Sequence, residues 1–187
     1  NQTQIQESTA NGKAISKGSA TGVLAGEVQN KSSIKNSYAI GEAKGSRDIG
    51  GLAGYVNESS IINCFSNAMA SGNEGIASLV GQTLNDSKIK NNITLVNQLT
   101  GYKFDGRTAK NKFTNFSNNY ENEGNIGTST LTRTDIDFTG KISVAKESDV
   151  ERVSFYTETL SWSDTIWDFS GVKNGELPKL KNSDPNE

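Results

Sequence analysis

The residue types that carry most enzyme chemistry are scarce in this chain. Its 187 residues include no histidine and one cysteine, Cys64. A Ser-His-Asp or Cys-His site therefore cannot be built, and the usual catalytic zinc sites, which rely on histidine ligands, are excluded as well. Cys64 also has no second cysteine with which to form a disulfide. We expect no catalytic, cofactor-binding or metal-binding residue in this chain, and no cofactor.

Two pairs of carboxylates have a spacing that could do chemistry. Glu121 and Glu123 lie two residues apart, as do Asp135 and Asp137. On a strand such residues project to one face, where two carboxylates could bind calcium or act as acid and base. Solvated surface carboxylates show the same spacing, so both interpretations stay open.

The glycine-rich stretch Gly50–Gly54 superficially resembles a phosphate-binding loop, but no Lys-Ser/Thr follows it. Instead the stretch recurs. Gly26 to Gly54 is 28 residues, and Gly54 to Gly81 is 27. A period in this range is the signature of a repeat architecture. Gly50–Gly54 is therefore the middle copy of a structural unit.

Each repeat holds two short segments in which key residues alternate, as in strands. The segments are separated by polar turns. Residues in equivalent positions of the three repeats form columns: Leu24, Leu52 and Leu79; Gly26, Gly54 and Gly81; Ile34, Ile61 and Ile89; Asn36, Asn63 and Asn91.

Two short strands cannot bury themselves as a lone hairpin, but stacked coils can. The sequence therefore predicts an all-β fold, a right-handed parallel β-helix whose leucine and isoleucine columns fill the interior. A propeller blade needs a longer period. The glycine column either allows close approach of a neighbouring wall or provides a positive φ. The asparagine column is either an amide ladder or a set of polar corner residues.

We expect three regions: a lead-in or edge at 1–19 with a partial strand near 13–16, repeats and divergent coils at 20–146, and a C-terminal capping segment at 147–187. The last would hold a short helix over Val150–Leu160, a turn at Asn174-Gly175 and an edge strand at Leu177–Leu180. Its aromatic cluster is Trp162, Trp167 and Phe169. A solenoid needs a cap over its open end; an aromatic sugar-binding platform is the alternative.

Charge and hydropathy exclude two further classes of partner. The net charge is −2 and no basic stripe with interleaved aromatics appears, so we expect no nucleic-acid binding. No run of 18 apolar residues occurs, so we expect no membrane insertion. Three Asn-x-Ser patterns, beginning at Asn30, Asn57 and Asn85, fall in the same repeat slot and are explained by turn composition without glycans.

The segments Val23–Gly26, Gly51–Gly54 and Ser78–Gly81 resemble the GLUG repeat, and Asn63-Cys64-Phe65 fits its second segment. The third copy departs from the pattern at Ala77 and Ser78. GLUG repeats occur in the non-catalytic region of the immunoglobulin A1 protease family of streptococcal zinc metalloendopeptidases. The segments Phe155–Trp162, Ile166–Ser170 and Leu177–Asn182 are similar to the stretch that follows the repeats in that family.

The resemblance implies a non-catalytic β-helix module, upstream of a protease domain that holds zinc in a His-Glu-x-x-His helix. The parent would be a secreted or cell-wall-attached bacterial protein, and both ends of this chain look like cuts in a longer one. The module would act as a scaffold or contact immunoglobulin A1, another host protein or its own protease domain. The alternatives are an adhesin-type binding module and, by fold analogy alone, a carbohydrate-active β-helix enzyme.

Overall fold

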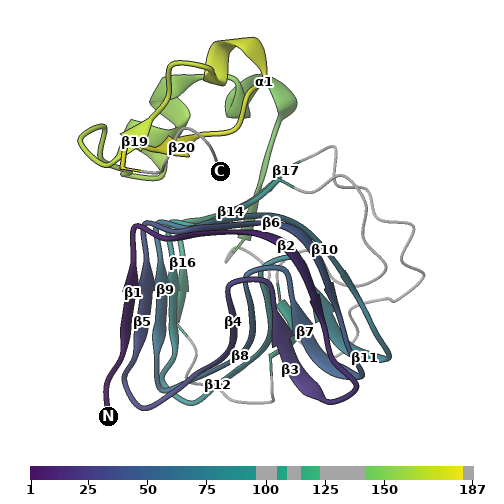
Figure 1. Cartoon of the computed structure of the whole chain (residues 1–187). Helices are drawn as coiled ribbons and strands as arrows, with labels where there is room; N and C mark the ends of the chain where they lie inside the picture. The colour runs from purple at the N-terminus through teal and green to yellow at the C-terminus, as the bar shows by residue number, and fades with distance from the viewer. Residues whose placement is uncertain (96–104, 109–114, 123–141, 183–187) are drawn as a thin grey trace.

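The structure is a computed structural model of the chain that describes residues 1–95, 105–108, 115–122 and 142–182. Four parallel sheets run along a solenoid and are named here sheets A to D (Figure 1). Sheet A contains β1 (Gln4–Gln6), β5 (Ser33–Lys35), β9 (Ser60–Ile62), β13 (Lys88–Lys90) and β16 (Asn115–Ser117). Sheet B contains β2 (Thr9–Ile15), β6 (Tyr38–Lys44), β10 (Phe65–Ser71), β14 (Ile93–Thr94), β17 (Asn119–Asn122) and β18 (Ile142–Ala145).

The other two sheets complete each coil. Sheet C contains β3 (Ser19–Gly22), β7 (Arg47–Gly50) and β11 (Glu74–Ala77). Sheet D contains β4 (Ala25–Val28), β8 (Ala53–Asn57), β12 (Val80–Leu84) and β15 (Asp105–Thr108). From β1 to β12 the chain passes three times through sheets A, B, C and D in turn and moves one strand along with each circuit. In Figure 1 it turns clockwise as it recedes from the viewer, so the parallel β-helix is right-handed, as the sequence predicts.

The register of the strands matches the repeat period. Ile61 pairs with Ile34 in one direction and with Ile89 in the other. All three side chains are fully buried in the interior, together with Leu52 and Leu79. Leu24, at the start of the series, is only partly buried against the same cluster. Stacked identical or similar side chains thus fill a narrow interior.

Each of the three coils from β1 to β12 has four strands where the sequence analysis found two segments. The strands that were missed belong to sheet C and to the second half of sheet B. They enclose a separate small core of alanines and isoleucines: Ala43, Ile49, Ala70 and Ile76.

Residues 1–19 carry more structure than the expected lead-in with a partial strand. They contain β1, β2 and the start of β3, and these pair in parallel with β5, β6 and β7. Ile5 aligns with Ile34 and packs against the interior cluster. The first coil is therefore a coil of the solenoid in its own right.

The C-terminal segment, residues 146–182, leaves sheet B through β18 and folds over the outer face of that sheet (Figure 1). It contains α1 (Glu147–Val150), a π-helical turn (Phe155–Thr159), a 3₁₀ turn (Val172–Asn174) and a two-stranded antiparallel ribbon of β19 (Trp167–Asp168) and β20 (Lys179–Leu180). The expected short helix is present with other bounds than Val150–Leu160: helical structure begins at Glu147, is interrupted at 151–152 and resumes over 153–159.

The position of this segment corrects a second expectation. It was predicted to close the open end of the solenoid, but it covers the side. Its aromatic residues share one buried cluster with Tyr38, Phe65 and Ile93, which come from three successive coils of sheet B. Tyr38, Phe65 and Ile93 therefore point outward, toward the C-terminal segment. The isoleucine and leucine columns fill the interior of the solenoid instead.

Candidate functional site

Cysteine is the most reactive residue type in the chain, but the surroundings of Cys64 make this thiol inert. The side chain is fully buried, and its Sγ lies 3.2 Å from the carbonyl oxygen of Ile62. Burial raises the pKa of the thiol from an ordinary 9.0 to about 12. Because the thiolate is the nucleophilic form, this thiol has no role in covalent catalysis.

The asparagine column forms the corner between sheets A and B. Asn63 Nδ2 donates to Asn36 Oδ1 at 3.1 Å, and Asn91 Nδ2 donates to Asn63 Oδ1 at 3.1 Å. Asn118, one coil further, donates to Asn91 Oδ1 at 2.9 Å. All four residues have positive φ, between 47° and 56°. The column is therefore both an amide ladder and a set of corner residues, because asparagine tolerates the left-handed corner and its amide spans the distance between coils.

A second polar column lies one residue further along, inside the solenoid, and the sequence analysis missed it. Asn92 Oδ1 accepts a hydrogen bond from the backbone N–H of Cys64 at 2.9 Å, and Asn92 Nδ2 donates to Asn119 Oδ1 at 3.0 Å. Both asparagines are buried. The doubled asparagines at 91–92 and 118–119 were the available signal. Each buried amide is satisfied by its neighbouring coils, so the column is structural.

The glycine column permits close approach and does not supply a positive φ. A Cβ at Gly54 would lie 2.4 Å from the backbone carbon of Ala20, and one at Gly81 would lie 2.3 Å from that of Asp48. A Cβ at Gly26 would lie 2.8 Å from the carbonyl oxygen of Ala20. The left-handed residues are the opposing ones, Ala20 and Asp48, with φ of 59° and 56°. Their kinked backbone approaches sheet D so closely that only glycine fits.

The serines of the three Asn-x-Ser patterns are buried in the turns between sheets D and A. Ser32 Oγ accepts the backbone N–H of Thr3, and Ser59 Oγ accepts that of Ser32, both at 3.1 Å. Ser87 Oγ also lies within hydrogen-bonding reach of the carbonyl oxygen of Leu84. Hydrogen bonding in the turn accounts for the shared pattern.

The C-terminal segment is fixed to the asparagine corner by polar contacts. Trp162 Nε1 donates to the backbone oxygen of Asn91 at 2.8 Å, and Asn118 Nδ2 donates to that of Thr159 at 2.6 Å. Trp162 also stacks on Trp167, with ring centroids 4.6 Å apart. Trp162, Trp167 and Phe169 are 2%, 0% and 6% exposed, so none offers a free face for a sugar ring. The platform alternative is therefore wrong.

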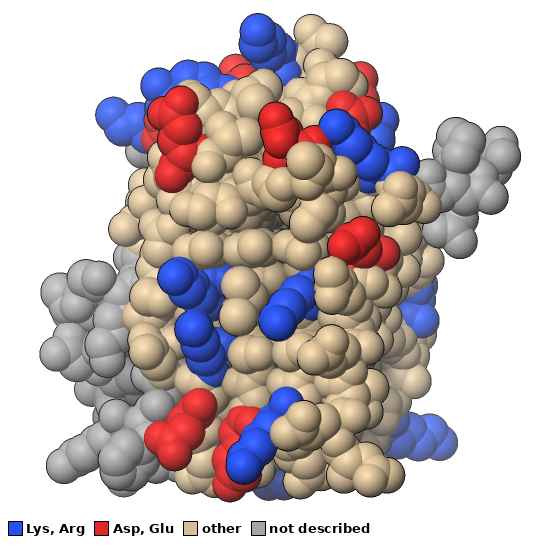
Figure 2. All heavy atoms as spheres, turned by 90° about the vertical axis from the view of Figure 1, so that its left-hand side faces the viewer, with Lys and Arg blue, Asp and Glu red and all other residues tan. Residues whose placement is uncertain are grey.

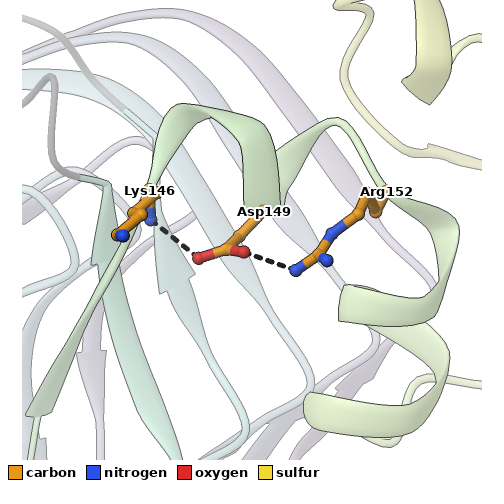
Figure 3. A network of polar contacts seen from close by, with 3 residues as sticks. All are labelled: Lys146, Asp149 and Arg152. Atoms are coloured by element: carbon orange, nitrogen blue, oxygen red, sulfur yellow. Dashed lines mark hydrogen bonds and ion pairs between the residues drawn. The ribbon is translucent and has the colours of Figure 1, made fainter.

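One charged network marks the beginning of this segment (Figure 3). Asp149 Oδ2 accepts the backbone N–H of Lys146 at 3.0 Å, and Asp149 Oδ1 pairs with the guanidinium of Arg152. A carboxylate that accepts an N–H at the first turn stabilises the start of a helix. The network ties α1 to the following turn and is typical of helix initiation.

A group of lysines lies on the outer face of sheet A, on the opposite side of the strands from the interior isoleucines. The group comprises Lys35, Lys88 and Lys90. Figure 2 shows positive side chains in the middle of this face and negative side chains toward its borders. We call these three residues the lysine patch. A flat strand surface with one sign of charge at its centre could contact an acidic partner.

The described residues contain no group of three or more potential metal ligands among His, Cys, Asp and Glu. A zinc site of the type implied by the family resemblance needs two histidines, which the sequence lacks. The residues of this chain therefore do not fit that metal. Of the carboxylate pairs, Glu123, Asp135 and Asp137 lie outside the described residues, and Glu121 lies in β17.

No helix in the described part of the chain is both long and apolar enough to cross a membrane.

Four parallel sheets that share one period define the class of fold, a parallel β-solenoid with a laterally docked C-terminal segment. Comparison with solved structures finds a similar fold in a protein from Bacteroides ovatus described as a "putative immunoglobulin A1 protease". The TM-score is 0.65 at 18% identity, over 97% of this chain and 75% of that one. At this identity the likeness shows the fold alone. No protein-family model matches the sequence, and no curated protein matches it significantly.

Proposed function

We propose that this chain is a non-catalytic module of an immunoglobulin A1 protease-like zinc metalloendopeptidase of the bacterial surface. The observation that carries the proposal is the shared fold with the Bacteroides ovatus protein over 97% of this chain, the C-terminal segment included in that span. The resemblance to GLUG repeats points to the same family. Zinc and the catalytic histidines would belong to a protease domain elsewhere in the parent protein, which would be secreted or attached to the cell wall.

The module would serve in two ways, as a rigid scaffold and as a contact surface for immunoglobulin A1 or another host protein. Stacked coils give a rigid, repetitive surface that suits both roles. The lysine patch is the surface we propose for contact, because it places three cations on a flat sheet in a chain of net charge −2. Charge complementarity raises association rates and selects partners.

Binding to immobilised immunoglobulin A1, followed by biolayer interferometry, tests the contact role. We expect a Kd below about 100 µM and at least a tenfold weakening in the triple variant Lys35→Glu, Lys88→Glu and Lys90→Glu. A matched control with the same change in charge is Lys17→Glu, Lys44→Glu and Lys173→Glu, which lies away from sheet A. Equal weakening in both variants contradicts the patch, and no binding at that concentration leaves only the scaffold role.

An adhesin-type binding module is the second candidate function, and the lysine patch favours it too. An adhesin would bind an acidic surface component without any protease in the same protein. The parent sequence distinguishes the two, since a His-Glu-x-x-His segment supports the protease and further repeats support the adhesin.

A further inference from the structure

The first coil, β1 to β4, has one side paired with the second coil and one side that faces away from it. We call the latter the N-terminal face; the coil is drawn in purple in Figure 1. The C-terminal segment packs on the outer face of sheet B and not on this edge. None of the four strands contains proline, and β1 and β3 contain no charged residue, whereas β2 and β4 contain one each, Lys13 and Glu27.

At two positions of each later coil, one in sheet A and one in sheet B, a backbone N–H group donates to a carbonyl of the preceding coil. The first position is that of Gln4, whose equivalents in the later coils are Ser33, Ser60, Lys88 and Asn115. The N–H group of each equivalent donates to a carbonyl of the preceding coil at 2.8–3.0 Å. The second position is that of Thr9, whose equivalents are Tyr38, Phe65, Ile93 and Tyr120. Their N–H groups also donate to carbonyls of the preceding coil, at 2.8–3.2 Å. The N–H groups of Gln4 and Thr9 therefore point out of the N-terminal face.

Side-chain acceptors follow the same rule. Ser32 Oγ accepts the N–H of Thr3, and Ser37 Oγ accepts the N–H of Ser8 at 3.2 Å, so a hydroxyl of one coil receives an N–H of the coil before it. Thr3 and Ser8 place hydroxyls in these two slots of the first coil. The first coil thus presents both the donors and the acceptors that an additional coil would use.

At this end the isoleucine column of the interior is incompletely covered. A hollow of about 360 Å³ lies at the corner between sheets D and A, and its wall holds Ile5 and Val28 together with Glu27 and other polar residues of the first coil and of the turn that follows it. Ile5 is only partly buried, whereas the aligned Ile34, Ile61 and Ile89 are fully buried. An isoleucine in the same slot of a preceding coil would cover it, as Ile34 covers the other side.

We propose that the N-terminal face binds one further coil of polypeptide, parallel to β1–β4 and carrying the same pattern of residues. The occupant would place an aliphatic side chain over Ile5 and backbone carbonyls opposite the N–H groups of Gln4 and Thr9. The interface would continue the coil-on-coil contacts of the solenoid, which bury aliphatic columns and pair both strand edges.

A fusion variant tests the proposal. A copy of residues 33–59 replaces residues 1–3, so that the copied Ser59 runs directly into Gln4 in the register of the coils. We expect the melting temperature to rise by about 5 °C and amide exchange of Gln4 and Thr9 to slow at least about tenfold. The matched control carries Ile34→Asp and Leu52→Asp in the copied segment only, and should show neither change.

Three results would overturn the proposal. One is unchanged exchange at Gln4 and Thr9 in the fusion, or the same change in its control. Another concerns the unmodified chain. We expect the amides of Gln4 and Thr9 to exchange there at least about 100-fold faster than those of Ser60 and Phe65, and equal rates would show that the face is already closed. The third is dimerisation of the unmodified chain at about 100 µM that the copied coil abolishes, which would identify a second copy as the occupant.

Discussion

At the scale of single residues, three neighbours at the corner of sheets A and B point in three directions. Asn63 adopts a left-handed φ of 56° and spans two coils with its amide. Cys64 then enters the interior, and Phe65 faces the C-terminal segment. The Asn-Cys-aromatic pattern therefore encodes a corner, an interior contact and an exterior contact in consecutive positions.

This corner limits what spacing alone could predict. Ile34, Asn36 and Tyr38 alternate in sequence, which suggests one shared face. The left-handed residue breaks that rule, so Ile34 lies inside and Tyr38 outside. The interior columns were predictable because each lies within a regular strand, whereas the direction of the aromatic residues depends on a φ value that many sequences could adopt.

The burial of Cys64 has a consequence for stability at alkaline pH. The thiol keeps its proton in the folded chain to about pH 12, while in the unfolded chain it loses it near pH 9. Above pH 9 the unfolded state binds fewer protons, so the free energy of unfolding falls as pH rises. We expect a loss of about 1 kcal/mol between pH 8 and pH 10, measured by urea unfolding. Cys64→Ala should remove this part of the slope; an identical slope would contradict the assignment.

Gly54→Ala tests the close approach between sheets C and D. The added Cβ would lie 2.4 Å from the backbone of Ala20 and Thr21, which cannot move without disturbing β3. We expect a loss of about 2 kcal/mol in the free energy of unfolding. Gly18→Ala is the matched control, because its Cβ would meet only Ser16 Oγ at 3.5 Å. Similar values for the two variants would show that the coils do not need this glycine.

At the scale of elements, the predictable strands were those with long aliphatic side chains. Sheet C was missed because its strands have four residues each and left-handed residues at Ala20, Asp48 and Gly75 interrupt their alternation. The first coil was missed because β1 and β2 have Ile5 and small or polar residues where later coils have larger ones. Backbone pairing with the next coil supplies what these strands lack in apolar burial.

The two tryptophans of the C-terminal segment provide a matched pair at this scale. Both are buried, but Trp162 Nε1 donates to Asn91 whereas Trp167 Nε1 has no hydrogen-bond partner in the described structure. Trp162→Phe should therefore cost about 1–2 kcal/mol more than Trp167→Phe in chemical denaturation. The same order should hold for the rate of limited proteolysis within the segment. Equal losses would mean that the bond to the asparagine corner does not hold the segment.

At the scale of the whole molecule, the C-terminal segment and the solenoid share one aromatic and aliphatic cluster across sheet B. Tyr38 and Phe65 stack with ring centroids 4.6 Å apart, and Phe65 lies 5.9 Å from Trp167. The sequence predicted the aromatic cluster and the solenoid separately. It could not predict their lateral contact, since that depends on which face of sheet B the aromatic residues occupy. Joined in this way, the two parts should move as one rigid body, which the proposed scaffold role requires.

Equilibrium unfolding followed by two probes tests this joint structure most directly. Both tryptophans lie in the C-terminal segment, so their fluorescence reports on it, while far-ultraviolet circular dichroism reports mainly on the strands of the solenoid. We predict a single cooperative transition with coincident midpoints for the two probes, and a shift of both to lower denaturant in Phe65→Ser. A fluorescence transition that precedes the loss of strand signal, or a Phe65→Ser shift confined to fluorescence, would contradict the account of one rigid module.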